Sequence, residues 1–390
     1  MEILFLKKLL GNLCTIPFSA GFWDGTVENY GSGEPQFKII FNRPLPKRQM
    51  FYDPSLAFGE SYMDGLIDYE GNLQEILKAI YQNETSFLNS KLAKEAKRLR
   101  KPSLKQQKKD VQYHYDLGND FFSLWLDETK SYSCGYFASP DDTLLQAQLN
   151  KIDHTLKKLN LQVGQSLLDI GSGWGWLIIR AAKKYGVNAL GITLSEEQYN
   201  HTKERIKEEK VSELVKVELK DYRELATTDR KFDAVVSVGM VEHVGQANLP
   251  VYMKTVNKLL KPQGLSLLHS ITHQTEEAVN KWASKYIFPG GYIPSIRELV
   301  SLMPEHNFRL IDVESLRLHY AKTLEHWAAN FEDNVEAIQK KFDERFVRMW
   351  RLYLNGCATS FRYGKGLDIH QFLFTKGLNN NIPMTRHTAF

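Results

Sequence analysis

The sequence predicts an α/β protein in which a mostly parallel, doubly wound sheet follows a smaller α+β domain. Three observations support this class. From about residue 161 onward, apolar strand-like runs alternate with amphipathic helical stretches. A glycine-rich turn follows the first of these strands and opens a helix. The first 90 residues instead mix turn-rich aromatic sequence with short strand-like runs.

Composition limits the classes of function. Hydrophobic residues make up 43% of the 390 residues and charged residues 25%, which is typical of a globular chain with two or three domains. The formal net charge of +4 does not predict a nucleic-acid binder. Cys14, Cys134 and Cys357 are too far apart for a disulfide framework or a zinc cage, so we expect a reducing, cytoplasmic location. No apolar run reaches the roughly 18 residues of a spanning helix, so membrane contact would be peripheral.

Two domains and a linker are predicted along the chain. A strand at 37–41 and a helix at 73–81 place a small accessory domain at 1–95. A stretch rich in lysine and arginine, broken by Pro102 and Ser103, predicts a basic linker at 96–110. Residues 111–390 form the second domain.

The second domain contains the alternation of strand-like runs and helical stretches. Its predicted strands lie at 166–170, 188–194, 214–220, 232–239 and 264–272. Helical periodicity fills the stretches that follow the first, second and fourth strands. After these, the pattern predicts one long charged helix at 324–354 and a last strand at 370–376.

The turn after the first strand reads LLDIGSGWG, from Leu167 to Gly175. Glycines let the backbone approach a ligand closely, and ligands of α/β sheets bind at the carboxyl ends of the strands. The dinucleotide fingerprint fails because Trp176 stands where its third glycine belongs, and because Thr193 and Leu194 stand where its ribose-binding acid belongs. An NAD-dependent oxidoreductase is therefore disfavoured.

A strand acid followed by this turn resembles the S-adenosylmethionine site of class I methyltransferases. Asp169 would lie near the amino-acid or ribose end of the cofactor. Asp221 and Tyr222, at the end of the third strand, are placed to meet the adenine by hydrogen bond and stacking. By position alone, Asp221 fits a solvated strand-end acid nearly as well.

Further segments extend this resemblance to a family. They are HYDLGNDFF (114–122), SYSCGYF (131–137), VGMVEHVG (238–245) and LLHSIT (267–272), together with GITLSEEQ and YLNGCATSFR. From about residue 55 to near the C-terminus, the chain resembles the cyclopropane-fatty-acyl-phospholipid synthases. The resemblance implies methyl transfer from S-adenosylmethionine to a cis double bond of an unsaturated phospholipid in the membrane, followed by ring closure. With its N-terminal segment, the chain is similar to the bacterial phospholipid-acting enzymes rather than to the shorter mycolic-acid enzymes.

The resemblance also implies roles for individual residues. It implies that the base is a bicarbonate ion held by Cys134, Glu242, His269, the backbone of Ile271, and Tyr320. Tyr115 would lie near the reacting centre, and Cys357 matches a cysteine assigned to the family's active site. The cofactor would be bound by Tyr132, Ser133, Asp169, Gly171, Ser172, Gly173, Thr193, Leu194, Gln198, Asp221 and Tyr222.

The chemistry of this set is coherent. A histidine and a tyrosine can donate hydrogen bonds to an anion, and a glutamate can accept one from the hydroxyl of bicarbonate. Glu242 and His269 also follow the fourth and fifth strands, at the edge of the sheet that carries the glycine turn. Structural roles remain open for Cys134, Glu242, His269 and, above all of these, Tyr320. A structural role is also open for Cys357, because the reaction needs no covalent enzyme intermediate. His243 and His319 are interpreted as structural.

Partners and alternatives complete the prediction. We expect a homodimer that associates with the inner face of the cell membrane and binds no nucleic acid. The basic residues 91–109 could meet anionic headgroups or could be a solvated linker. An N-terminal helix with Phe5, Leu6, Leu9 and Leu10 is expected to dock on its own domain. The alternatives are a methyltransferase without ring closure and a catalytically silent lipid-binding protein.

Overall fold

The computed structural model describes residues 2–83, 85–89 and 117–385. Tyr115 and the predicted linker at 96–110 lie outside these residues. The chain divides into two compact units. Unit 1 takes in residues 1–97, 278–289 and 321–365, and unit 2 takes in residues 98–277, 290–320 and 366–390. Among the described residues, no helix combines the length and apolar character needed to cross a bilayer.

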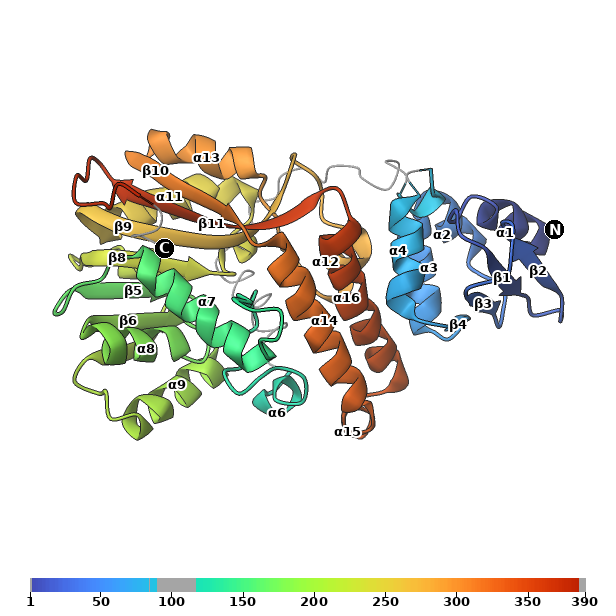
Figure 1. Ribbon diagram of the computed structural model, residues 1–390, viewed down its shortest axis with the longest axis horizontal. Coiled ribbons are helices and arrows are strands. Elements are labelled where there is room, and N and C mark those ends of the chain that lie inside the picture. Colours follow the sequence, from blue (N-terminus) through green and yellow to red (C-terminus); the bar gives the residue numbers. More distant parts are fainter. Residues whose placement is uncertain (1, 84, 90–116, 386–390) are drawn as a thin grey trace. The chain divides into compact units, whose positions relative to one another are not determined.

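Unit 2 contains a seven-stranded sheet with the strand order β10-β11-β9-β8-β5-β6-β7. These strands are β5 (Ser166–Ile170), β6 (Asn188–Thr193), β7 (Val215–Leu219), β8 (Phe232–Val238), β9 (Leu260–His273), β10 (Phe308–Ser315) and β11 (Leu367–Lys376). The strands from β9 to β7 in this order pair in parallel, whereas β11 and β10 add antiparallel pairs at one edge (Figure 1). The predicted fold class, a mostly parallel doubly wound sheet, is confirmed.

Helices cover both faces of this sheet (Figure 1). They are α6 (Asn119–Phe122), α7 (Leu144–Lys158), α8 (Trp176–Tyr185), α9 (Glu196–Glu208), α10 (Tyr222–Leu225), α11 (Leu249–Leu259) and α13 (Ile296–Glu305), with 3-10 turns η3 (Val241–His243) and η4 (Gln246–Asn248). Because side chains alternate along a strand, Leu167 packs in the core beneath α7 and α8, while Leu168 packs in the core beneath α11 and α13. Burial on both faces explains why the parallel strands are nearly continuous apolar runs.

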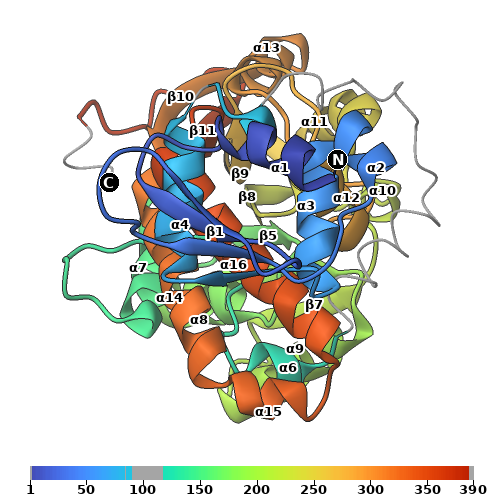
Figure 2. The same ribbon diagram turned by 90° about the vertical axis from the view of Figure 1, so that its right-hand side faces the viewer.

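Unit 1 contains a four-stranded sheet with the order β2-β1-β3-β4 and the helices packed with it (Figure 2). Its strands are β1 (Phe18–Gly21), β2 (Val27–Tyr30), β3 (Lys38–Phe41) and β4 (Ile67–Glu70). Its other elements are α1 (Glu2–Leu10), α2 (Lys47–Tyr52), α3 (Pro54–Met63), α4 (Leu73–Gln82), η1 (Phe87–Asn89), α12 (Lys281–Tyr286), α15 (Val335–Gln339), α16 (Glu344–Tyr363) and all but the first turn of α14 (Arg317–Asp333). Leu6 and Leu10 of α1 are buried in the core of this unit.

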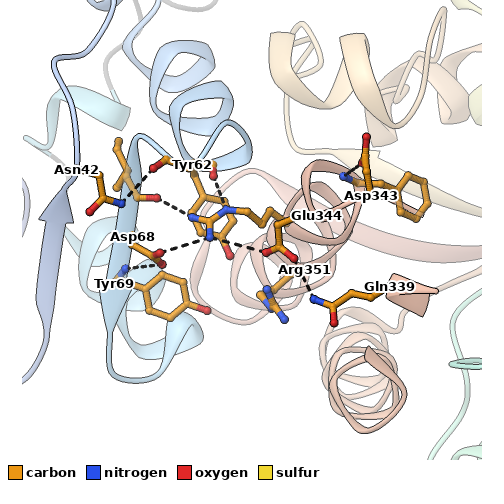
Figure 3. A network of polar contacts seen from close by, with 12 residues as sticks. Asn42, Tyr62, Asp68, Tyr69, Gln339, Asp343, Glu344 and Arg351 are labelled. Atoms are coloured by element: carbon orange, nitrogen blue, oxygen red, sulfur yellow. Dashed lines mark hydrogen bonds and ion pairs between the residues drawn. The ribbon is translucent and has the colours of Figure 1, made fainter. Parts of the chain in front are cut away.

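The units differ from the predicted domains, because two later segments belong to unit 1. The long amphipathic helix α16 packs against α3 and α4 and thereby buries its apolar face within this unit. Polar contacts support this packing (Figure 3). The Arg348 guanidinium donates to the carbonyls of Tyr62 and Ile67 at 2.6 and 2.7 Å and lies over the Tyr62 ring.

The prediction of one long helix at 324–354 is wrong. Three helices, α14, α15 and α16, occupy this region. The helical run ends at Asp333, and α16 begins anew at Asp343, whose carboxylate accepts a hydrogen bond from the Phe346 amide at 2.8 Å. An aspartate at this position caps a helix by satisfying an otherwise unpaired amide, so it starts a helix rather than continuing one.

Candidate active site

A pocket of about 1190 Å³, including its open mouth, lies in unit 2 beside the carboxyl ends of β5, β6, β7 and β8. This is the edge of a parallel sheet where ligands bind. All of the predicted cofactor-binding residues line it: Tyr132, Ser133, Asp169, Gly171, Ser172, Gly173, Thr193, Leu194, Gln198, Asp221 and Tyr222. His243, interpreted from the sequence as structural, lines it as well.

The glycine turn forms one wall of the pocket and is tied to β6. The amides of Gly171 and Ser172 both donate to the carbonyl of Ile192 at 3.0 Å. Gly175, the residue before α8, has a φ of 82°, and a Cβ added there would lie 2.4 Å from the side chain of Thr202. Only glycine fits both this backbone conformation and this close approach. The turn is therefore held rigidly where it faces the pocket.

The opposite wall is formed by residues that follow β7. Asp221 caps α10 and accepts hydrogen bonds from the backbone amide, Nε and Nη2 of Arg223 at 2.8, 2.8 and 2.7 Å. The neighbouring Tyr222 ring is 6% exposed, and burial raises the pKa of its hydroxyl to about 12. This wall presents a flat aromatic ring and a carboxylate that is already paired, which suits an uncharged, planar ligand group.

Buried opposite charges lie on the side of β5. Asp169 is 3% exposed, and among the described residues its Oδ1 has no hydrogen-bond partner. Burial raises the pKa of Asp169 to about 7, although the charge of Lys151 opposes this shift. Lys151, on α7, also lines the pocket. Lys151 was not among the residues predicted from the sequence, and the available signal was a lysine at helical spacing from Leu144 and Ala147, on the face that α7 buries.

Glu242 and Ile271, two of the residues predicted for the reacting centre, are in direct contact. Glu242 lies in η3, and its Oε1 accepts a hydrogen bond from the Ile271 amide at 2.8 Å. Its Oε2 is buried without a hydrogen-bond partner among the described residues. Burial raises the pKa of this carboxyl to about 7. Glu242 itself does not line the pocket, but its neighbours Met240 and His243 do.

His269 lies on β9 directly beside Val238, a residue of the pocket wall. Its side chain is fully buried, and its Nε2 has no hydrogen-bond partner among the described residues. Burial lowers the pKa of the imidazole to about 3, so His269 is neutral at physiological pH. A neutral imidazole can donate from one ring nitrogen and accept at the other.

Cys134 contacts the residue that precedes the helix carrying Tyr320. The Cys134 thiol donates to the carbonyl of Leu316 at 3.8 Å, and the Tyr320 amide donates to it at 3.0 Å. Both side chains are buried. Cys357 instead lies on α16 in unit 1, and burial raises the pKa of its thiol to about 12. A thiol with this pKa is a poor nucleophile.

Comparisons with known proteins identify the family and its relatives. The family described as mycolic acid cyclopropane synthetase matches residues 102–372, and a domain family of unknown function matches residues 5–92. A probable fatty acid methyltransferase of Pseudomonas putida is 36% identical over 384 residues, covering 96% of each chain.

Two further relatives extend the comparison. A cyclopropane-fatty-acyl-phospholipid synthase of Escherichia coli K12 is 36% identical over 91% of this chain and 92% of its own. A mycolic acid cyclopropane synthase, solved with S-adenosylhomocysteine and CTAB, superimposes with a TM-score of 0.64 and 38% identity over 69% of this chain and 98% of its own. The chain therefore belongs to the family of mycolic acid cyclopropane synthetases and is an S-adenosylmethionine-dependent enzyme.

Proposed function

We propose that this protein is a cyclopropane-fatty-acyl-phospholipid synthase. It would add the methyl group of S-adenosylmethionine to a cis double bond of a phospholipid acyl chain and then close a three-membered ring. The observation that carries the proposal is a pair of buried atoms without hydrogen-bond partners among the described residues, Glu242 Oε2 and His269 Nε2. Glu242 lies in η3, close in sequence to the pocket residues Met240 and His243, and His269 lies on β9 beside the pocket residue Val238. Methyl transfer alone needs no such pair.

The pocket would bind S-adenosylmethionine, which supplies the methyl group. Its glycine turn leaves room for a ligand, and the unpartnered oxygen of Asp169 and the ring of Tyr222 offer contacts to its polar and aromatic parts. An alkene is a weak, neutral nucleophile, so the enzyme must position it and exclude water. Buried apolar residues of the lining, such as Ile170 and Trp174, serve the exclusion of water.

Ring closure requires that a base take a proton from the added methyl group. A bicarbonate ion would supply that base. Glu242 Oε2 can accept from the hydroxyl of bicarbonate, and His269 Nε2 can donate to one of its oxygens. Cys134, Tyr320 and the backbone of Ile271 would complete the cage, as the family resemblance implies. In this structure the Ile271 amide holds Glu242 in place.

A second candidate is fatty-acyl methyl transfer without ring closure. The Pseudomonas putida relative is named as a probable fatty acid methyltransferase, and its identity to this chain equals that of the Escherichia coli synthase. The two reactions differ in the fate of the proton. Glu242 and His269 support the synthase, because each carries a buried polar atom without a described partner that could contact a base.

Product analysis tests the proposal. We expect that the purified protein, S-adenosylmethionine and vesicles of a cis-unsaturated phospholipid give a lipid that has gained one methylene group and shows the upfield proton signals of a cyclopropane. Glu242→Gln should keep cofactor binding and lose this product. A methyl-branched product would favour the second candidate, and binding of lipid and cofactor without turnover would favour a silent lipid-binding protein.

Membrane association, cytoplasmic location and a homodimer are part of the same proposal. The substrate lies in a bilayer, so the enzyme must reach the inner membrane surface. On α2 the side chains of Phe51 and Tyr52 are 79% and 69% exposed, and Lys47 and Arg48 on the same short helix are exposed cations. Aromatic rings beside cations suit an anionic membrane surface. Sedimentation analysis of the full chain tests the dimer.

A further inference from the structure

Lys151 is a buried lysine in the wall of the cofactor pocket. It is 4% exposed, and its Nζ donates to the hydroxyl of Ser133 at 3.0 Å. One turn earlier on α7, the amide of Gln148 donates to the carbonyls of Ser131 and Ser133 at 3.2 and 2.8 Å. The helix therefore fixes the segment 131–133 against the pocket and holds the ammonium in one place.

This ammonium lacks a counter-ion within the described part of the chain. No described carboxylate lies within ion-pairing distance of Lys151, and its hydrogen-bonding partner is the neutral Ser133. Asp127 and Asp169 act on it only through longer-range attraction. Burial lowers the pKa of Lys151 to about 8, so it is mostly protonated at neutral pH. A buried cation is costly unless an anion faces it, so this site suits an anionic group of the ligand.

The other cations of the pocket wall are already paired. Arg223 forms an ion pair with Asp221 at 2.7 Å, and Lys220 forms one with Glu218 at 2.9 Å. Both follow β7, two strand positions from β5, which corresponds to about 10 Å across a sheet. Lys151 and Asp169 therefore mark one side of the pocket, and Tyr222 marks the other.

S-adenosylmethionine has the matching distribution of charge. One end is a planar, uncharged adenine, and the other is an amino acid with a carboxylate and an ammonium. With the adenine at Tyr222, the amino-acid end lies on the side of Lys151 and Asp169. We propose that the Lys151 ammonium, together with the Ser133 hydroxyl, binds the carboxylate of S-adenosylmethionine. The proposal rests on the cofactor pocket assigned under the proposed function.

Two ligands that differ in the amino-acid part test this role. S-adenosylhomocysteine carries the carboxylate, whereas 5′-methylthioadenosine keeps the adenosine and the sulfur but lacks the whole amino acid. Calorimetric titration of Lys151→Met should show a loss of affinity for S-adenosylhomocysteine of roughly tenfold to a hundredfold, as expected for a hydrogen bond between charged groups. Affinity for 5′-methylthioadenosine should stay within about twofold, which also shows that the variant is folded.

Lys220→Met is the matched control, because it removes a lysine from the same pocket wall on the side of the adenine. It should leave the ratio of the two affinities unchanged. Equal changes for both ligands, or no change, in Lys151→Met and also in Lys151→Gln would overturn the role of Lys151. Tyr222→Ala tests the pocket assignment separately from the role of Lys151. If that variant binds both ligands as tightly as the wild type, the assignment of this pocket to S-adenosylmethionine is wrong.

Discussion

The Nε2 of Gln371 lies 3.2 Å from Nδ1 of His269 and 3.2 Å from the hydroxyl of Thr155. The pairing of β9 with β11 places these two residues directly opposite each other. An amide nitrogen donates and cannot accept, so Nδ1 of His269 must accept. The proton of the neutral imidazole is thereby fixed on Nε2, the atom that faces no described partner.

Gln371→Glu should move this proton. A carboxylate accepts from Nδ1–H, so the variant would favour the other tautomer and leave Nε2 as an acceptor. We expect turnover to fall by at least about tenfold with unchanged affinity for S-adenosylhomocysteine. Nitrogen NMR of labelled histidine reports the tautomer. Thr155→Val, which removes only the second partner of the amide, should keep the tautomer, and the same loss of turnover there would contradict this account.

The rate should depend on pH through Glu242. The ionised carboxylate can only accept hydrogen bonds, as the proposed contact with the hydroxyl of bicarbonate requires, whereas the protonated carboxyl carries a competing donor. Burial raises the pKa of this carboxyl to about 7. Activity should therefore be low at pH 5 and rise as the pH passes through about 7. Initial rates between pH 5 and 9 measure this rise in activity, and the residual activity of Glu242→Gln should not show it. A rise that persists in the variant would assign it to another group.

The free energy of unfolding should also depend on pH through Glu242, and it should fall as the pH rises. The folded-state pKa of Glu242 lies above its ordinary value of 4.5, so the unfolded state releases the proton first as the pH rises. Ionisation then disfavours the folded state, increasingly from about pH 4.5 to above pH 7. Relative to the wild type, Glu242→Gln should gain thermal stability at pH 8 and gain none at pH 4. An equal shift at both values would exclude this titration as the cause.

Two glycines of the cofactor turn should respond differently to alanine. At Gly175 a Cβ would meet the side chain of Thr202 at 2.4 Å in a left-handed backbone conformation, so Gly175→Ala should cost about 2 kcal/mol or more of stability. At Gly173 no atom lies within 4 Å of the added Cβ. Gly173→Ala should cost only about 1 to 2 kcal/mol through its backbone and act mainly on cofactor affinity. Urea unfolding and calorimetry separate the two effects.

Arg348 should be important for the stability of unit 1. Its removal would take the Arg348 donor from the carbonyl of Ile67 and one of two donors from the carbonyl of Tyr62, which also accepts from the Gly65 amide at 3.1 Å. It would also remove the contact with the Tyr62 ring. Arg348→Met is therefore expected to cost about 2 to 4 kcal/mol in denaturant unfolding. Arg345→Met is the matched control: its ion pair with Asp64 is about half exposed and should contribute less than about 1 kcal/mol.

The exposed aromatic residues of α2 should contribute to membrane binding. Replacing Phe51 and Tyr52 together by serine should lower the fraction of protein that sediments with anionic phospholipid vesicles by several-fold, because two amphipathic rings no longer enter the interface. Val163→Ser in unit 2 removes an equally exposed apolar side chain and should have no effect. Equal binding by the wild type and the double variant would remove α2 from the proposed membrane surface.

The sequence by itself determined the parallel strands and the glycine turn, because these depend on local patterns. Short, mostly apolar runs define β5 to β8, and the glycines after Asp169 mark the turn wherever the rest of the chain lies. Asp169, Thr193, Asp221 and Tyr222, which line the cofactor pocket, follow from these strand ends. The long helix was misread because helical periodicity continues across a break that only the cap at Asp343 reveals.

Only the tertiary structure decided which distant side chains meet. Gln371 and His269 are 102 residues apart, and their contact depends on the register of an antiparallel strand pair. Lys151 faces the pocket because α7 packs on one face of the sheet and turns this residue toward β5. The Cys134 thiol reaches the Leu316 carbonyl, 182 residues along the chain, for the same kind of reason. Local periodicity fixes which face of an element is buried, whereas packing between elements fixes what that face touches.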